Sequence, residues 1–67
     1  MIPYHVRQAD EVLPYFTSTG LSRVHRQLFL LIDGRRPALE LTRLMGRTPH
    51  EIQTLLTDLA RVGLIGY

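Results

Sequence analysis

The chain has 67 residues, a formal net charge of +2 and no cysteine. A chain of this length forms at most one domain, whose core contributes only about 3–5 kcal/mol, so it usually needs a staple or a partner. Disulfides are excluded as that staple, and His5, His25 and His50 match no metal-ligand spacing. No apolar run reaches the roughly 18 residues of a membrane span, and no signal peptide is evident. We therefore expect a cytoplasmic protein without a metal or a cofactor.

Residues 1–20 contain Pro3, Pro14 and the polar stretch TSTG, and they show no sustained hydrophobic period. This composition predicts an N-terminal extension made of a short strand or helix and a turn. Residues 21–67 are regularly patterned, and we expect them to form the domain itself.

The first clear helix starts after Ser22, a good N-cap residue, and runs to about Ile32, where Asp33 and Gly34 end it. Phe29 lies at the edge of its apolar stripe. The stripe itself consists of residues at helical spacing: Leu21, Val24, Leu28, Leu31 and Ile32.

Two residues of this helix break its pattern. His25 lies inside the apolar arc, where a lone histidine is usually a core or boundary residue with a satisfied hydrogen bond, although a pH switch is an alternative. Leu30 faces away from the arc, so it is either simply exposed or covered by Tyr15, Phe16 or a partner chain.

A second, shorter helix is predicted over roughly residues 37–45, with Pro37 in its first turn and Gly46 closing it. Its shared apolar face consists of Ala38, Leu41, Leu44 and Met45.

A third helix is predicted from Pro49 to Val62, because Thr48 and Glu51 form a T-x-x-E capping box and Gly63 follows its end. Its apolar stripe consists of Ile52, Leu55, Leu56, Leu59 and Val62. The closing LIGY segment is apolar and can form a strand.

Three helices with a glycine turn between the second and the third have the helix-turn-helix order. Residues 28–65, LFLLIDGRRPALELTRLMGRTPHEIQTLLTDLARVGLI, resemble the winged helix-turn-helix domains of bacterial transcriptional regulators. The resemblance rests on IDG-R, A-x-E-L, a glycine turn, T-P-x-E-I, a leucine stripe and L-x-x-x-G-L-I. It implies a mostly α fold, a three-helix winged helix-turn-helix with a short β segment at the C-terminus.

Two features depart from that family. Pro37 stands where members usually have a capping serine or threonine, and the sequence ends at Tyr67, where the family turns into the second wing strand. Three explanations stay open: the wing is absent, the chain is one domain of a longer protein, or LIGY pairs with the N-terminal YHV or with a second copy.

The resemblance also implies that the third helix offers its outer face to the major groove of DNA. The polar residues on that outer arc are expected to meet base edges: His50, Gln53, Thr54, Thr57 and Arg61. Residues of the two turns and the second helix are expected to contact phosphates: Arg35, Arg36, Arg43, Arg47 and Thr48. An ordinary solvated surface is the competing interpretation for each of these residues.

The sequence therefore predicts a small DNA-binding regulator that acts as a homodimer or with a partner protein. The rival is a protein- or peptide-interaction module on the same scaffold, which binds along the third helix and adds a strand to LIGY; a homo-oligomerisation domain is a third possibility. No nucleophilic cysteine, Ser-His-acid order or glycine-rich phosphate loop occurs, so we expect a non-enzyme.

Overall fold

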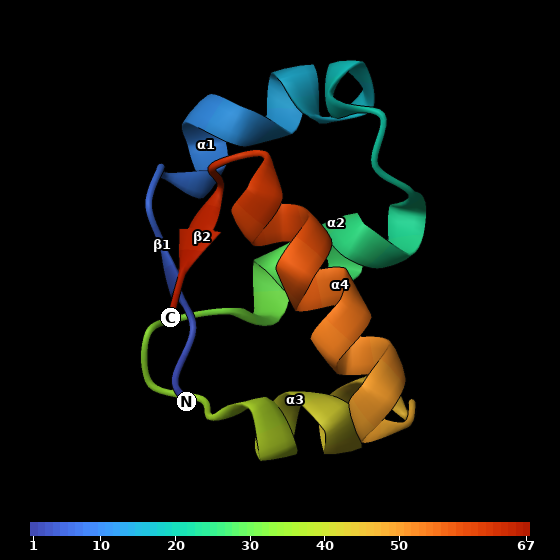
Figure 1. Cartoon of the computed structure of the whole chain (residues 1–67). Coiled ribbons are helices and arrows are strands. Elements are labelled where there is room, and N and C mark those ends of the chain that lie inside the picture. The colour runs from blue at the N-terminus through green and yellow to red at the C-terminus, as the bar shows by residue number, and fades with distance from the viewer.

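In the computed structural model, which describes residues 1–67, four α-helices lie between two short strands near the ends of the chain (Figure 1). The elements in chain order are β1 (Tyr4–His5), α1 (Ala9–Val12), the 3₁₀ helix η1 (Leu13–Thr19), α2 (Arg23–Leu31), α3 (Ala38–Met45), α4 (Pro49–Arg61) and β2 (Ile65–Gly66). The fold is mostly α, as expected, and residues 1–20 hold both a strand and helical turns. None of the helices has the length and hydropathy that a transmembrane span requires.

Capping boxes fix the starts of the two helices that pack on each other. At α2 the Ser22 hydroxyl accepts from the His25 N–H, and the His25 ring accepts from the Ser22 N–H. At α4 the Thr48 hydroxyl and the Glu51 carboxylate make the same reciprocal pair, with Pro49 in the first helical position. These bonds satisfy two backbone donors that the start of a helix otherwise leaves free. The predicted start of α4 is confirmed.

The turn between α3 and α4 consists of three residues and begins with a glycine that has a left-handed backbone. Gly46 has φ of +64°; its N–H donates to the Arg43 carbonyl, and the next N–H, of Arg47, donates to the Thr42 carbonyl. This pair of bonds is the Schellman motif, which satisfies the last carbonyls of a helix and reverses the chain. α4 ends in the same way around Gly63, and the chain then enters β2.

The two strands pair with each other and bring the ends of the chain together on one side of the molecule (Figure 1). They run antiparallel, with Tyr4 opposite Gly66 and His5 opposite Ile65. The structure therefore contains the predicted pairing of LIGY with the N-terminal YHV.

One hydrophobic core joins both parts of the chain. α4 crosses between α1 and α3 and packs on α2 (Figure 1). The eleven buried apolar residues of the core are Val12, Phe16, Leu28, Phe29, Ile32, Leu41, Ile52, Leu56, Leu59, Leu64 and Ile65.

Phe29 is the point at which the N-terminal residues attach to α2. Its ring stacks on His5 at a centroid distance of 4.2 Å and contacts Phe16 at 5.9 Å, and the His5 Nε2 lies 2.7 Å from the Phe29 carbonyl. Phe29 is fully buried although it lies at the edge of the stripe, because His5 and Phe16 cover it. The hydrophobic period of the helix cannot predict this burial, because the covering side chains come from residues 1–20.

Leu30 behaves as its outward position predicts and stays 46% exposed. Neither proposed N-terminal cover shields it, because Tyr15 is itself 69% exposed and Phe16 is buried in the core.

Candidate nucleic-acid interface

The outer face of α4 is polar along its whole length. Successive residues of a helix turn by about 100°, so the positions opposite the buried Ile52, Leu56 and Leu59 face solvent. All five residues predicted to meet base edges lie there and are exposed: His50, Gln53, Thr54, Thr57 and Arg61. The structure thus brings them together on one surface, which we call the α4 face.

Local hydrogen bonds decide what this face offers to a ligand. The hydroxyls of Thr54 and Thr57 donate to the carbonyls four residues earlier, those of His50 and Gln53. Each hydroxyl proton is thereby used, and the oxygen lone pairs remain available as acceptors. The amide of Gln53 has only a long contact, 3.5 Å, to the Thr57 hydroxyl. Gln53 can therefore still present the donor and the acceptor that match an adenine edge.

The two carboxylates beside the α4 face are bonded to other residues of the same chain. Asp58 accepts from the His25 Nε2 at 2.8 Å, and Arg61 lies 3.7 Å from its second oxygen. Glu51 accepts from the Thr48 N–H and pairs with Arg47 at 3.0 Å. These bonds, the Thr48 N–H first among them, hold the pKa of Glu51 below its ordinary value.

Among the residues predicted to contact phosphates, three are already engaged. Arg47 pairs with Glu51, the Thr48 hydroxyl belongs to the capping box, and Arg36 donates to the Leu31 carbonyl at 2.9 Å. The side chains of Arg35 and Arg43 form no hydrogen bond or ion pair within the chain and are exposed.

These residues do not form a single patch. Arg35 and Arg36 lie in the loop before α3, beside β1 in Figure 1, whereas Arg47 and Thr48 follow the other end of α3.

A shallow hollow of about 210 Å³ adjoins the start of α4 and is lined by Arg47, His50, Glu51, Thr54 and Leu55.

Two side-chain hydrogen bonds near the predicted site cannot be predicted from the helical patterns alone. Asp33, read only as a helix end, accepts from the backbone N–H groups of Arg35 and Arg36 at 2.9 Å, and these bonds lower the pKa of its carboxyl group. Aspartate side chains in turns often accept a hydrogen bond from the backbone N–H two residues later, and the sequence DGRR offers this signal. The His25–Asp58 bond spans 33 positions and has no local signal. The structure contains no group of three or more side chains suited to hold a metal ion.

Comparison of the chain with protein-family models, with curated proteins and with solved structures finds no match.

Proposed function

We propose that the chain binds double-stranded DNA and inserts α4 into the major groove. The observation that carries the proposal is the α4 face: five exposed side chains with amide, hydroxyl, imidazole and guanidinium groups and no carboxylate among them. Such groups recognise base edges, and an α-helix fits the width of the major groove.

The arrangement around α4 supports a winged helix-turn-helix reading of the fold. α3 and α4 are joined by a three-residue turn that begins with Gly46, as in helix-turn-helix motifs. α2 packs behind them as the remaining helix of the trio. In this proposal β1 supplies to β2 the strand partner that a second wing strand supplies in that family.

The formal charge of the last two-thirds of the chain also suits a polyanionic ligand. Residues 23–67 carry seven of the eight arginines and four of the six acidic residues, a formal charge of +3. Arg35 and Arg43, which have no carboxylate partner, are the residues that we assign to phosphates first. Two phosphate contacts predict that affinity falls about tenfold when salt rises from about 50 to 200 mM.

The test is fluorescence anisotropy of a labelled duplex that has been selected from random DNA for binding to the chain. Arg61→Ala and Gln53→Ala should each weaken binding by about 1–3 kcal/mol, because each removes one proposed base contact. Circular dichroism would check that both variants stay folded, as expected for exposed residues.

Arg23→Ala is the matched control, because it removes the same charge as Arg61→Ala from another face. Arg23 lies about 160° around α2 from His25, which points at α4, so it faces away from α4. Affinity for the selected duplex should be unchanged in this variant. Equal affinity of Arg61→Ala, Gln53→Ala and the unmodified chain would refute the proposal.

A further inference from the structure

The outward side of α2 carries a surface that the proposed DNA contact does not use. Arg23, Arg26, Gln27 and Leu30 follow one another at helical spacing on the side of α2 that faces away from the core, and all four are exposed. We call this surface the α2 face.

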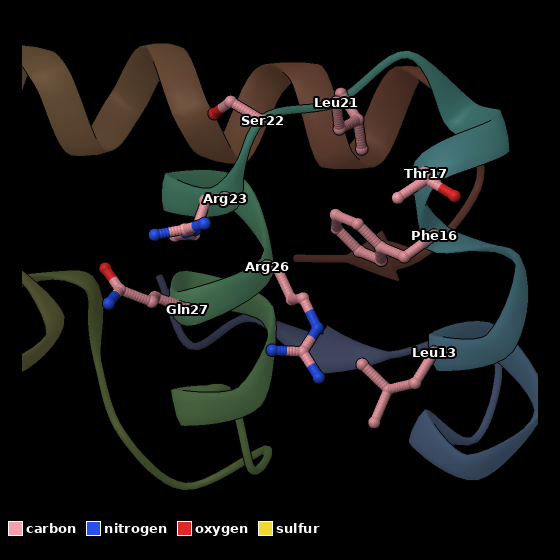
Figure 2. A pocket seen from close by; sticks show the side chains of 8 residues that line it. All are labelled: Leu13, Phe16, Thr17, Leu21, Ser22, Arg23, Arg26 and Gln27. Atoms are coloured by element: carbon pink, nitrogen blue, oxygen red, sulfur yellow. The ribbon is translucent and has the colours of Figure 1, made fainter.

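A cavity of about 320 Å³ lies between the α2 face and η1 (Figure 2). Its apolar wall consists of Leu13, Phe16 and Leu21. In Figure 2 the Arg26 side chain extends from α2 toward Leu13, so its guanidinium group lies at the mouth of an apolar hollow.

A second, wider hollow of about 490 Å³ lies between α2 and α3 and is lined mainly by apolar side chains. Leu30 and Leu44 contribute to it and are 46% and 52% exposed. Gln27 lines both hollows, which lie on its two sides. The two leucines therefore offer exposed apolar surface on which an apolar side chain of a ligand can pack.

The charge of the two hollows indicates what would occupy them. Together they are lined by twelve residues, which include Arg23 and Arg26 and no acidic residue. Neither arginine forms an ion pair or a side-chain hydrogen bond, and Arg35 and Arg43 are unpaired too; Arg23 and Arg26 differ from those two in lining a hollow. The guanidinium groups of Arg23 and Arg26 therefore lack a carboxylate partner. The apolar side chains that line the two hollows lack an apolar group packed against them.

We propose that the α2 face binds an acidic amphipathic segment of another protein. Large apolar side chains of the segment enter the two hollows, and a carboxylate between them pairs with Arg26 or Arg23. A segment fits better than a small molecule, because the hollows lie on both sides of α2 and a ligand must cross the helix to fill both. A nucleic acid has the negative charge, but its backbone has no apolar groups for these walls.

The test is a selection from a displayed library of random short peptides on the full chain, followed by affinity measurements on the enriched peptides. We expect enriched peptides with a net negative charge and at least two large apolar residues. Arg26→Glu and Arg23→Glu should each weaken their binding by about tenfold or more, because the carboxylate of the peptide then meets a like charge. Leu30→Ala should weaken it as well.

Arg61→Glu makes the same change of charge on the α4 face and should leave peptide affinity unchanged. Both arginines of the α2 face are exposed and unpaired, so their variants should keep the circular dichroism spectrum of the unmodified chain. The proposal is overturned if no peptide is enriched, if enriched peptides are basic or uncharged, or if they bind Arg26→Glu and Arg23→Glu with unchanged affinity.

A dimer that sedimentation velocity detects and Arg26→Glu dissociates would also overturn it, since a second copy would then occupy the α2 face. The proposal does not depend on DNA binding: a chain that fails to bind DNA can still select acidic peptides, and the converse holds too.

Discussion

The ring of His25 is hydrogen-bonded on both of its nitrogens. Its Nδ1 accepts from the Ser22 N–H at 3.1 Å, so the proton of the neutral ring lies on Nε2, which donates to Asp58 at 2.8 Å. One side chain thus caps α2 and ties it to α4. This confirms the expectation of a boundary histidine with satisfied hydrogen bonds.

His25→Ala should lower the free energy of unfolding by roughly 2 kcal/mol, because it removes a cap and a bond between helices. Urea denaturation followed by circular dichroism measures this difference. His50→Ala is the matched control: His50 is exposed and its ring has no hydrogen bond, so its loss should change stability by less than about 0.5 kcal/mol. An equal decrease in the free energy of unfolding of both variants would show that the hydrogen bonds of the His25 ring do not stabilise the fold.

Two carboxylates make stability depend on acid pH. Backbone N–H groups lower the pKa of Asp33, and the Thr48 N–H and hydroxyl lower that of Glu51, from ordinary values of 3.8 and 4.5. A lowered folded pKa means that the unfolded chain binds protons first on acidification. The stabilisation is therefore complete above about pH 4.5 and is lost as the pH falls through the lowered values.

Melting temperatures between about pH 2 and 7 test this prediction. The melting temperature should fall below about pH 4.5, and Glu51→Gln and Thr48→Ala should each reduce the fall, because each removes part of the bonding that favours the carboxylate. An unchanged acid dependence in both variants would contradict the assignment to the α4 capping box.

At the scale of elements, the N-terminal segment behaves as part of the core. Residues 1–20 contribute Val12 and Phe16 to the same buried cluster as the later helices, and β1 pairs with β2. Phe16→Ala should therefore destabilise the whole chain by about 3–5 kcal/mol, enough to unfold much of so small a domain.

The neighbouring aromatic residue supplies the control. Tyr15 is largely exposed and its hydroxyl has no hydrogen bond, so Tyr15→Ala should shift the urea midpoint only slightly. Equal urea midpoints for Phe16→Ala and Tyr15→Ala would contradict this prediction, because residues 1–20 would then contribute nothing to the stability of the core.

The helices of residues 21–67 were predictable because their signals are local. Ser22, Thr48 and Gly46 cap or close helices through bonds to residues at most five positions away, and such spacings can be read from the sequence. The α4 face was predictable for the same reason, since a helical wheel needs only the period.

Contacts between distant residues could not be predicted from spacing. The burial of Phe29 depends on His5 and Phe16, and the bond of His25 depends on Asp58. The two hollows also require knowledge of how η1 and α3 lie against α2. The helical pattern of α2 does place Leu30 outward, on the same side as Arg23, Arg26 and Gln27, but not the hollows beside them.

The whole molecule presents two separate exposed faces, one on α2 and one on α4. α2 and α4 meet through the core and through His25 and Asp58, so the outward sides of the two helices point away from each other. We propose DNA for the α4 face and an acidic partner segment for the α2 face. Because the two faces share no residue, the two proposals can be tested independently.

The chain contains no asparagine and three glutamines, Gln8, Gln27 and Gln53, so an NMR spectrum of the ¹⁵N-labelled chain has one side-chain amide for each region. Gln53 lies on the α4 face, Gln27 on the α2 face and Gln8 before α1. The most direct test of DNA binding is to titrate this spectrum with the selected duplex at low salt. If α4 enters the major groove, the resonances of the Gln53 amide shift while those of the Gln27 and Gln8 amides stay in place. A Gln53 amide that does not move, or a Gln27 amide that moves more, would contradict the assignment of DNA to α4.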